Sequence, residues 1–106
     1  MEEIVHQFMV LAEREDFTPV IVFLPESGEL AGYDDGDPPR YAKFKKKLQE
    51  SYASADLIMA DVYEEELEVG PFMTRAGCHP SEYGNKIIAR AVHRAIADRV
   101  AQLKAK

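Results

Sequence analysis

Apolar side chains recur at helical spacing at both ends of the chain. Near the amino end they lie three and four residues apart behind the acidic pair Glu2-Glu3, which suits the positive end of a helix dipole. We therefore expect a first helix that ends near Glu15. Near the carboxyl end one apolar face follows Ser81, a residue type that caps helix starts, and predicts a long final helix. Its members are Tyr83, Ile87, Ile88, Ala91, Val92, Ala95, Ile96, Val100 and Leu103.

Two unbroken apolar runs lie between these helices. The run "VIVFLP" closes at Pro25, and a second run extends from Asp56 to Tyr63; such runs are typical of strands covered on both faces in a parallel sheet. Residues 40–53 carry a buried stripe among lysines and predict a helix that crosses between the strands. Residues 26–40 and 64–78 read as loops, rich in glycine, proline and acids. The pattern predicts one α/β domain over residues 1–106, in the order α-β-α-β-α.

A sheet of two parallel strands leaves an unpaired apolar edge. Soluble proteins cover or pair such edges, because exposed backbone groups and apolar side chains invite association. Either this chain is one end of a larger α/β domain, or two copies join edge to edge across a two-fold axis into a four-stranded sheet. In both cases we expect a homo-oligomer formed through a strand edge.

Composition and charge narrow the function further. The chain has 106 residues, 46% hydrophobic and 30% charged, with a formal net charge of -6, which gives phosphate backbones little to bind and argues against a nucleic-acid partner. No apolar run approaches the length of a membrane span. The single cysteine, Cys78, excludes an internal disulfide, and cytoplasm is the default compartment. The acidic turn "DDGD" fits no calcium-loop spacing, so no metal is expected. No glycine-rich phosphate loop follows a strand, and no cofactor is expected.

The segment "GCHPSEYGNKIIARAV", residues 77–92, sets a histidine and a proline before the final helix. With the two apolar strands before it, this block resembles the carboxyl-terminal half of the SGNH/GDSL hydrolase superfamily, whose members hydrolyse esters on a flavodoxin-like three-layer α/β/α fold. The resemblance implies that His79 is the general base that activates a serine nucleophile. It is carried by His79-Pro80, Ser81, Gly84 and the apolar stretch that follows. Gly84 is expected to allow close packing of the helix against the second strand.

Two parts of the family pattern are missing from this chain. The family has an aspartate three residues before the histidine, where this chain has Ala76, so another acid such as Glu82 or one of Glu64 to Glu68 would have to orient the imidazole. The glycine-aspartate-serine nucleophile block and the oxyanion-hole blocks have no counterpart either. Ser27, after the first strand, and Cys78, next to His79, are the alternatives within the chain.

Two functions are compatible with these observations. The first is the carboxyl-terminal part of an ester hydrolase in which His79 acts on a serine from the missing half, with this chain inactive by itself. The second is a non-catalytic α/β assembly module that dimerises through its exposed strand edge.

Overall fold

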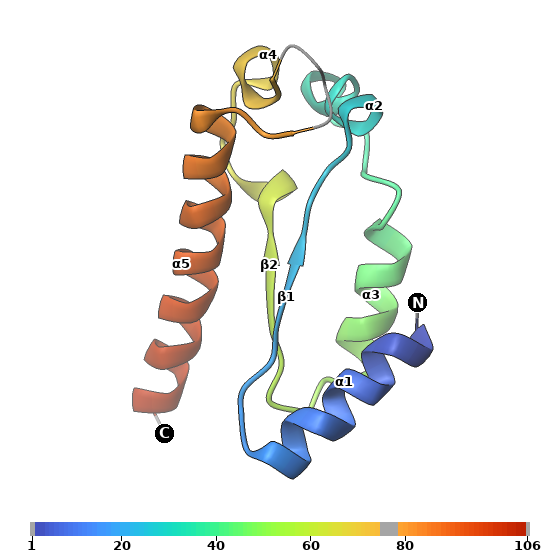
Figure 1. Cartoon of the computed structure of the whole chain (residues 1–106), viewed down its shortest axis with the longest axis vertical. Coiled ribbons are helices and arrows are strands. Elements are labelled where there is room, and N and C mark those ends of the chain that lie inside the picture. Colours follow the sequence, from blue (N-terminus) through green and yellow to red (C-terminus); the bar gives the residue numbers. More distant parts are fainter. Residues whose placement is uncertain (1, 75–78, 106) are drawn as a thin grey trace.

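A computed structural model describes residues 2–74 and 79–105. Figure 1 shows the helices, strands and short 3₁₀ helices in this part of the chain. In chain order they are α1 (Glu2–Glu15), β1 (Val20–Phe23), α2 (Ser27–Leu30), η1 (Tyr33–Asp35), α3 (Ala42–Ser51), β2 (Ile58–Asp61), η2 (Val62–Glu64), α4 (Val69–Phe72) and α5 (Glu82–Lys104). The predicted first, middle and final helices correspond to α1, α3 and α5.

β1 and β2 form a two-stranded parallel sheet, which confirms the predicted α/β class. Val20 lies opposite Ile58 and Phe23 opposite Asp61. Each strand has four residues and is shorter than the apolar run that predicted it. The first strand ends before Leu24 and Pro25, since proline has no N–H to continue a ladder.

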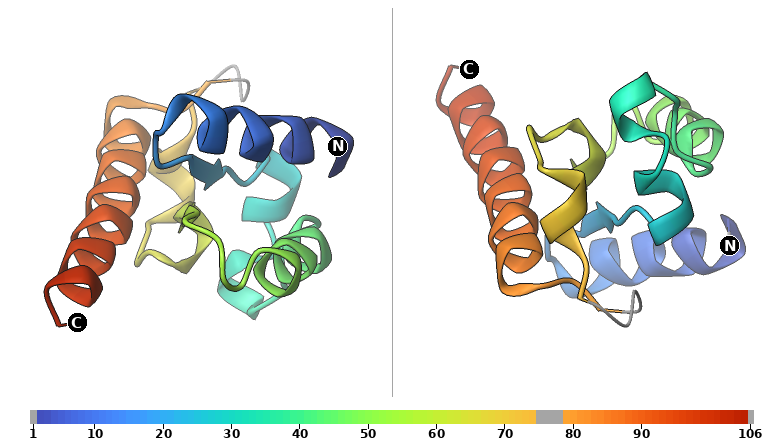
Figure 2. Two further views of the ribbon diagram at one scale, coloured as in Figure 1. Left: turned by 90° about the horizontal axis from the view of Figure 1, so that it is seen from below. Right: turned by 90° about the horizontal axis from the view of Figure 1, so that it is seen from above.

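Two hydrophobic clusters lie on opposite faces of this sheet, because successive strand side chains alternate in direction. On one face, Val5 of α1 and Leu48 of α3 pack with Phe23. On the other face, Ile87 and Ala91 of α5 pack with residues that include Val62, Phe72 and Leu30. Figure 2 shows the arrangement, with α5 on one side of the strands and α1 and α3 on the other.

Both segments predicted to be loops contain short helices. Residues 26–40 hold α2 and η1, and residues 64–78 hold the end of η2 and α4. Contacts between distant parts of the chain hold these helices: the Tyr63 hydroxyl of η2 donates to the Asp37 carbonyl at 2.7 Å, and the Tyr33 hydroxyl donates to the Glu65 carbonyl at 2.7 Å. At the start of α2, Glu26 and Glu29 form a capping box. The sequence pattern did not reveal these contacts, because the paired residues lie far apart in the chain.

Asp56 ties three segments together at the amino-terminal end of the sheet. Its carboxylate accepts a hydrogen bond from the Thr18 hydroxyl at 2.8 Å and another from Arg99 Nη2 of α5 at 2.7 Å. The hydrogen bond from Thr18 and then that from Arg99 hold the pKa of Asp56 below its ordinary value of 3.8.

This lowered pKa predicts acid sensitivity. Asp56 stabilises the fold above its unfolded pKa, and the contribution is lost as the pH falls through the folded pKa. Because the carboxylate is 55% exposed, we expect at most about 1 kcal/mol from the pair. Asp56→Asn should therefore flatten the fall in stability below pH ~4 in urea unfolding curves. Asp98→Asn, next to Arg99 in α5, is the control. An equal effect of both changes would contradict the assignment of the acid sensitivity to Asp56.

Candidate active site

The carboxyl ends of both strands, the short helices α2 and α4 and the start of α5 meet at one end of the molecule (Figure 1). This is the edge at which parallel α/β sheets bind their ligands. A hollow of about 560 Å³ opens here. It is lined by Leu24, Pro25, Glu26, Ser27, Gly28, Phe72, Met73, Pro80 and Ile88. The exit of the first strand and the segment next to His79 therefore share one hollow.

The start of α5 is built by residues of the "HPSEYG" segment. Ser81 is the N-cap, as expected, and its hydroxyl oxygen accepts the Gly84 N–H at 3.0 Å. The Ser81 N–H donates to the Phe72 carbonyl at 2.8 Å, which joins α5 to α4. A Cβ atom on Gly84 would lie 2.2 Å from the same carbonyl oxygen. The expectation that Gly84 permits close packing is correct, but its partner is Phe72 of α4 and not the second strand.

His79 lies two residues before this cap, with an exposed side chain. Its carbonyl oxygen accepts the Thr74 N–H at 2.9 Å, and an isolated antiparallel bridge joins Met73 to Pro80. The backbone is thus anchored at His79 and at Pro80. The imidazole makes no hydrogen bond to any of the described residues.

The other sequence candidates are spread over the molecule. Ser27 is the first residue of α2 and lines the hollow that Pro80 also lines. The suggested orienting acids have other partners: Glu64 pairs with Lys45 at 2.6 Å, and Glu82 lies 3.9 Å from Lys86. Glu65 is buried, 3.5 Å from Arg94. Glu66 and Glu68 line a separate hollow beside Tyr83. None of these carboxylates bonds to His79 in the described part of the chain, and Ala76 and Cys78 lie outside it.

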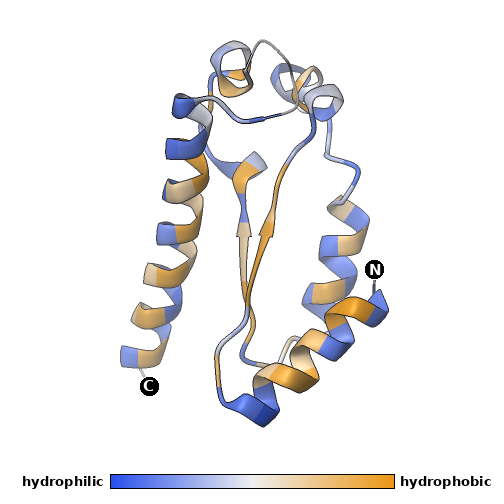
Figure 3. Ribbon diagram, in the orientation of Figure 1, coloured by the Kyte–Doolittle hydropathy of each residue, from blue (hydrophilic) through white to orange (hydrophobic). Residues whose placement is uncertain are grey.

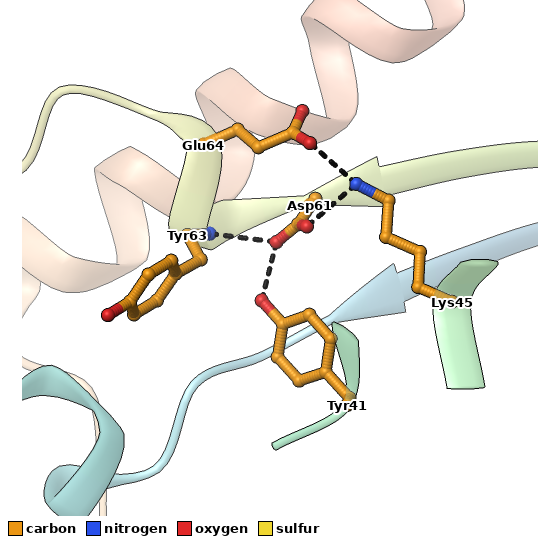
Figure 4. A network of polar contacts seen from close by, with 5 residues as sticks. All are labelled: Tyr41, Lys45, Asp61, Tyr63 and Glu64. Carbon is orange, nitrogen blue, oxygen red and sulfur yellow. Dashed lines mark hydrogen bonds and ion pairs between the residues drawn. The ribbon is translucent and has the colours of Figure 1, made fainter. Parts of the chain in front are cut away.

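A polar cluster at the end of β2 was not predicted from the sequence (Figure 4). The Asp61 carboxylate accepts hydrogen bonds from the Tyr41 hydroxyl at 2.5 Å, from Lys45 Nζ at 2.8 Å and from the Tyr63 N–H at 3.0 Å. Glu64 binds the same ammonium from outside. The apolar stripe in residues 40–53, formed by Tyr41, Phe44, Leu48 and Tyr52, predicted only a buried helix face. Lys45 was the available signal for the cluster, since it follows Phe44 and falls beside that face.

The electrostatics of this cluster favour a structural role. Burial, together with the hydrogen bond to Asp61, raises the pKa of Tyr41 far above its ordinary range, so the phenol stays protonated and acts as a donor. Burial acts to lower the pKa of Lys45, but the hydrogen bonds to Asp61 and Glu64 outweigh burial and raise it. The Asp61 carboxylate is already occupied by three donors of the cluster, Tyr41, Lys45 and Tyr63. The cluster therefore joins α3, β2 and η2 and offers no free base.

The described residues carry few other binding features. Across residues 2–74 and 79–105, no three histidine, cysteine or acidic side chains are grouped as metal ligands. No helix in these same ranges is long and apolar enough to cross a membrane.

Comparison with known proteins adds no relative. No protein-family model, curated protein or solved structure matches the chain.

Proposed function

We propose that this chain is the carboxyl-terminal part of an SGNH/GDSL-type serine ester hydrolase, in which further strands complete a flavodoxin-like three-layer fold. One observation carries the proposal: His79 stands at the carboxyl edge of a parallel sheet, two residues before the N-cap of α5, and its neighbour Pro80 lines a hollow at the exit of β1. General bases of α/β enzymes occupy this edge, because the loops that follow the strands converge there.

In this proposal the imidazole of His79 takes the proton from a serine hydroxyl as the serine oxygen attacks the ester carbonyl carbon. The imidazolium then returns the proton to the departing alcohol, and water hydrolyses the acyl-enzyme with His79 again as the base. The nucleophilic serine belongs to a segment outside this chain. The imidazole is suited to the role because it is exposed and because the backbone carbonyl of His79 is held by the Thr74 N–H.

The DNA upstream of the Met1 codon tests the proposal. We expect an in-frame glycine-aspartate-serine block after a predicted hydrophobic strand, and absence of the block would overturn the proposal. With that segment present, His79→Ala should lower kcat for a p-nitrophenyl ester by a factor of about 10⁴ or more. His93→Ala, an exposed histidine later in α5, is the matched control and should leave kcat unchanged. The chain by itself should show no hydrolysis above buffer.

A second candidate function is a non-catalytic assembly module that pairs through a strand edge. The observation that favours it is the open edge of β1, which keeps apolar residues such as Leu24 exposed. The upstream DNA separates the two functions, because a module needs no nucleophile block. Residual esterase activity of the isolated chain that His79→Ala removes would instead indicate a nucleophile within the chain, such as Ser27.

A further inference from the structure

The outer edge of β1 has unused hydrogen-bonding groups. Ile58 N–H donates to the Pro19 carbonyl at 3.0 Å, and backbone groups alternate in direction along a strand, so the odd-numbered residues of β1 face β2. Val20 and Val22 consequently turn their N–H and C=O groups outward. No described residue bonds to these groups, which leaves a ready template for another strand.

An apolar stripe of α1 flanks this edge on one face of the sheet. Glu2 bonds to Lys47 of α3 at 2.8 Å, which identifies the side of α1 that faces α3. Ile4, Phe8 and Leu11 are spaced by four and three residues and lie on the opposite side, next to the open edge. Ile4 is 66% exposed and Leu11 is 38% exposed. These side chains would contact a strand added to β1.

A second stripe, on α5, flanks the same edge on the other face. Ile88 lines the hollow beside Leu24 of the first strand's exit, which shows that this side of α5 is turned toward β1. Val92, Ile96 and Val100 follow at four-residue intervals, and Ile96 and Val100 are 40% and 43% exposed. Figure 3 shows the apolar strand β1 and the apolar residues that recur along α1 and α5.

The outer edge of β2 differs from this arrangement. The side of α5 beside it carries Arg94 and Asp98, and these line a small hollow with Asp61, Glu64 and Glu65. Charged side chains along an edge oppose strand addition, because pairing would bury them. The two edges are thus chemically distinct, with β1 apolar and β2 charged.

We propose that the isolated chain forms a two-fold dimer in which β1 pairs with β1 of a second copy, in antiparallel orientation, to give a four-stranded sheet. The second copy fits because its β1 carries apolar side chains on both faces and no charge, as a strand between two apolar helices requires. Antiparallel pairing also leaves room for both first helices. α1 lies toward the amino-terminal end of the strands, so the α1 of the second copy would lie at the opposite, carboxyl-terminal end (Figure 1).

This inference specifies the edge and the partner of the second candidate function, and it does not depend on hydrolysis by His79. It has a geometric consequence. Antiparallel strands place the carboxyl edges of the two copies at opposite ends of the joint sheet. The two His79 side chains therefore cannot share one site, and each hollow faces the partner's turn before β1, residues 16–19.

Sedimentation equilibrium over a concentration series tests the inference with two matched pairs of variants. Val22→Pro removes an N–H that points away from β2, and Met59→Pro removes the equivalent outward N–H on the other edge. Leu11→Lys places a charge on the stripe beside β1, whereas Val10→Lys changes its neighbour, 51% exposed on the α3 side of the helix. Far-ultraviolet circular dichroism checks that each variant folds, and the lysine pair keeps the test decisive if a proline variant does not.

We expect the wild-type chain to sediment at twice its 12.0 kDa mass. Val22→Pro and Leu11→Lys should raise the dissociation constant at least about tenfold, while Met59→Pro and Val10→Lys leave it unchanged. A wild-type monomer would overturn the inference and leave the hydrolase proposal standing. A dimer lost in Met59→Pro but kept in Val22→Pro would also overturn it, and would assign the assembly function to the β2 edge.

Discussion

Gly84→Ala should lower the free energy of unfolding by about 3 kcal/mol or more, the largest effect we expect from a single methyl group in this protein. The added Cβ would lie 2.2 Å from the Phe72 carbonyl oxygen and 3.1 Å from Cβ of Pro80. Phe72 cannot move away easily, because the residue is only 1% exposed and its carbonyl oxygen accepts a hydrogen bond from the Ser81 N–H. Relief of the clash would require α4 and α5 to move apart and would disrupt the segment that carries His79.

Urea unfolding monitored by circular dichroism measures the effect. Gly28→Ala is the matched control, because a Cβ at Gly28 in α2 would meet nothing within 4 Å. This control should leave stability unchanged or raise it by up to about 1 kcal/mol, since alanine restricts the unfolded chain. A Gly84 variant as stable as the Gly28 variant would show that α4 does not constrain α5.

Asp61→Ala should cost about 3 kcal/mol, because it removes the acceptor shared by Tyr41, Lys45 and Tyr63. The Asp61 carboxylate is 7% exposed and the Lys45 side chain 14%, so little water can replace the lost bonds. Lys45 keeps Glu64 as its partner, which limits the loss. The phenol of Tyr41 and the Tyr63 N–H lose their acceptor.

Glu64→Ala is the comparison for this change, since it removes the second carboxylate of the same ammonium from a position that is 71% exposed. An exposed ion pair contributes at most about 1 kcal/mol. The double variant Asp61→Ala with Lys45→Met should recover part of the loss, because it no longer leaves a half-buried cation without its inner partner. Equal losses for the Asp61 and Glu64 changes would contradict the central role of Asp61.

The long elements could be predicted because their patterns are local and repeated. The apolar face from Tyr83 to Leu103 and the capping serine before it define α5 within one stretch of chain. The β-branched and aromatic run at Val20–Phe23 likewise predicts a strand, although only Phe23 in it is fully buried. The short helices α2 and α4 were missed, because four residues carry too little periodicity and their stability comes from contacts with distant segments.

The candidate site likewise has a part that could be predicted from the sequence and a part that could not. The "HPS" segment identified His79 and the Ser81 cap from adjacent residues. The partner of Gly84, the hollow shared by Ser27 and Pro80, and the cluster around Asp61 join residues from separate elements. Pairs of this kind carry no sequence signal in a single chain, because either partner could satisfy its hydrogen bonds or its packing elsewhere.

By itself, the sequence determined the class of the protein: an α/β chain with two parallel strands and a histidine before its last helix. Only the tertiary structure decided that β1 carries the apolar open edge, that β2 is bordered by charge, and that Gly84 meets α4. The physical reason is that periodicity and capping act within one turn or one strand. Edge exposure, close backbone approach and shared acceptors arise only when separate segments are packed together.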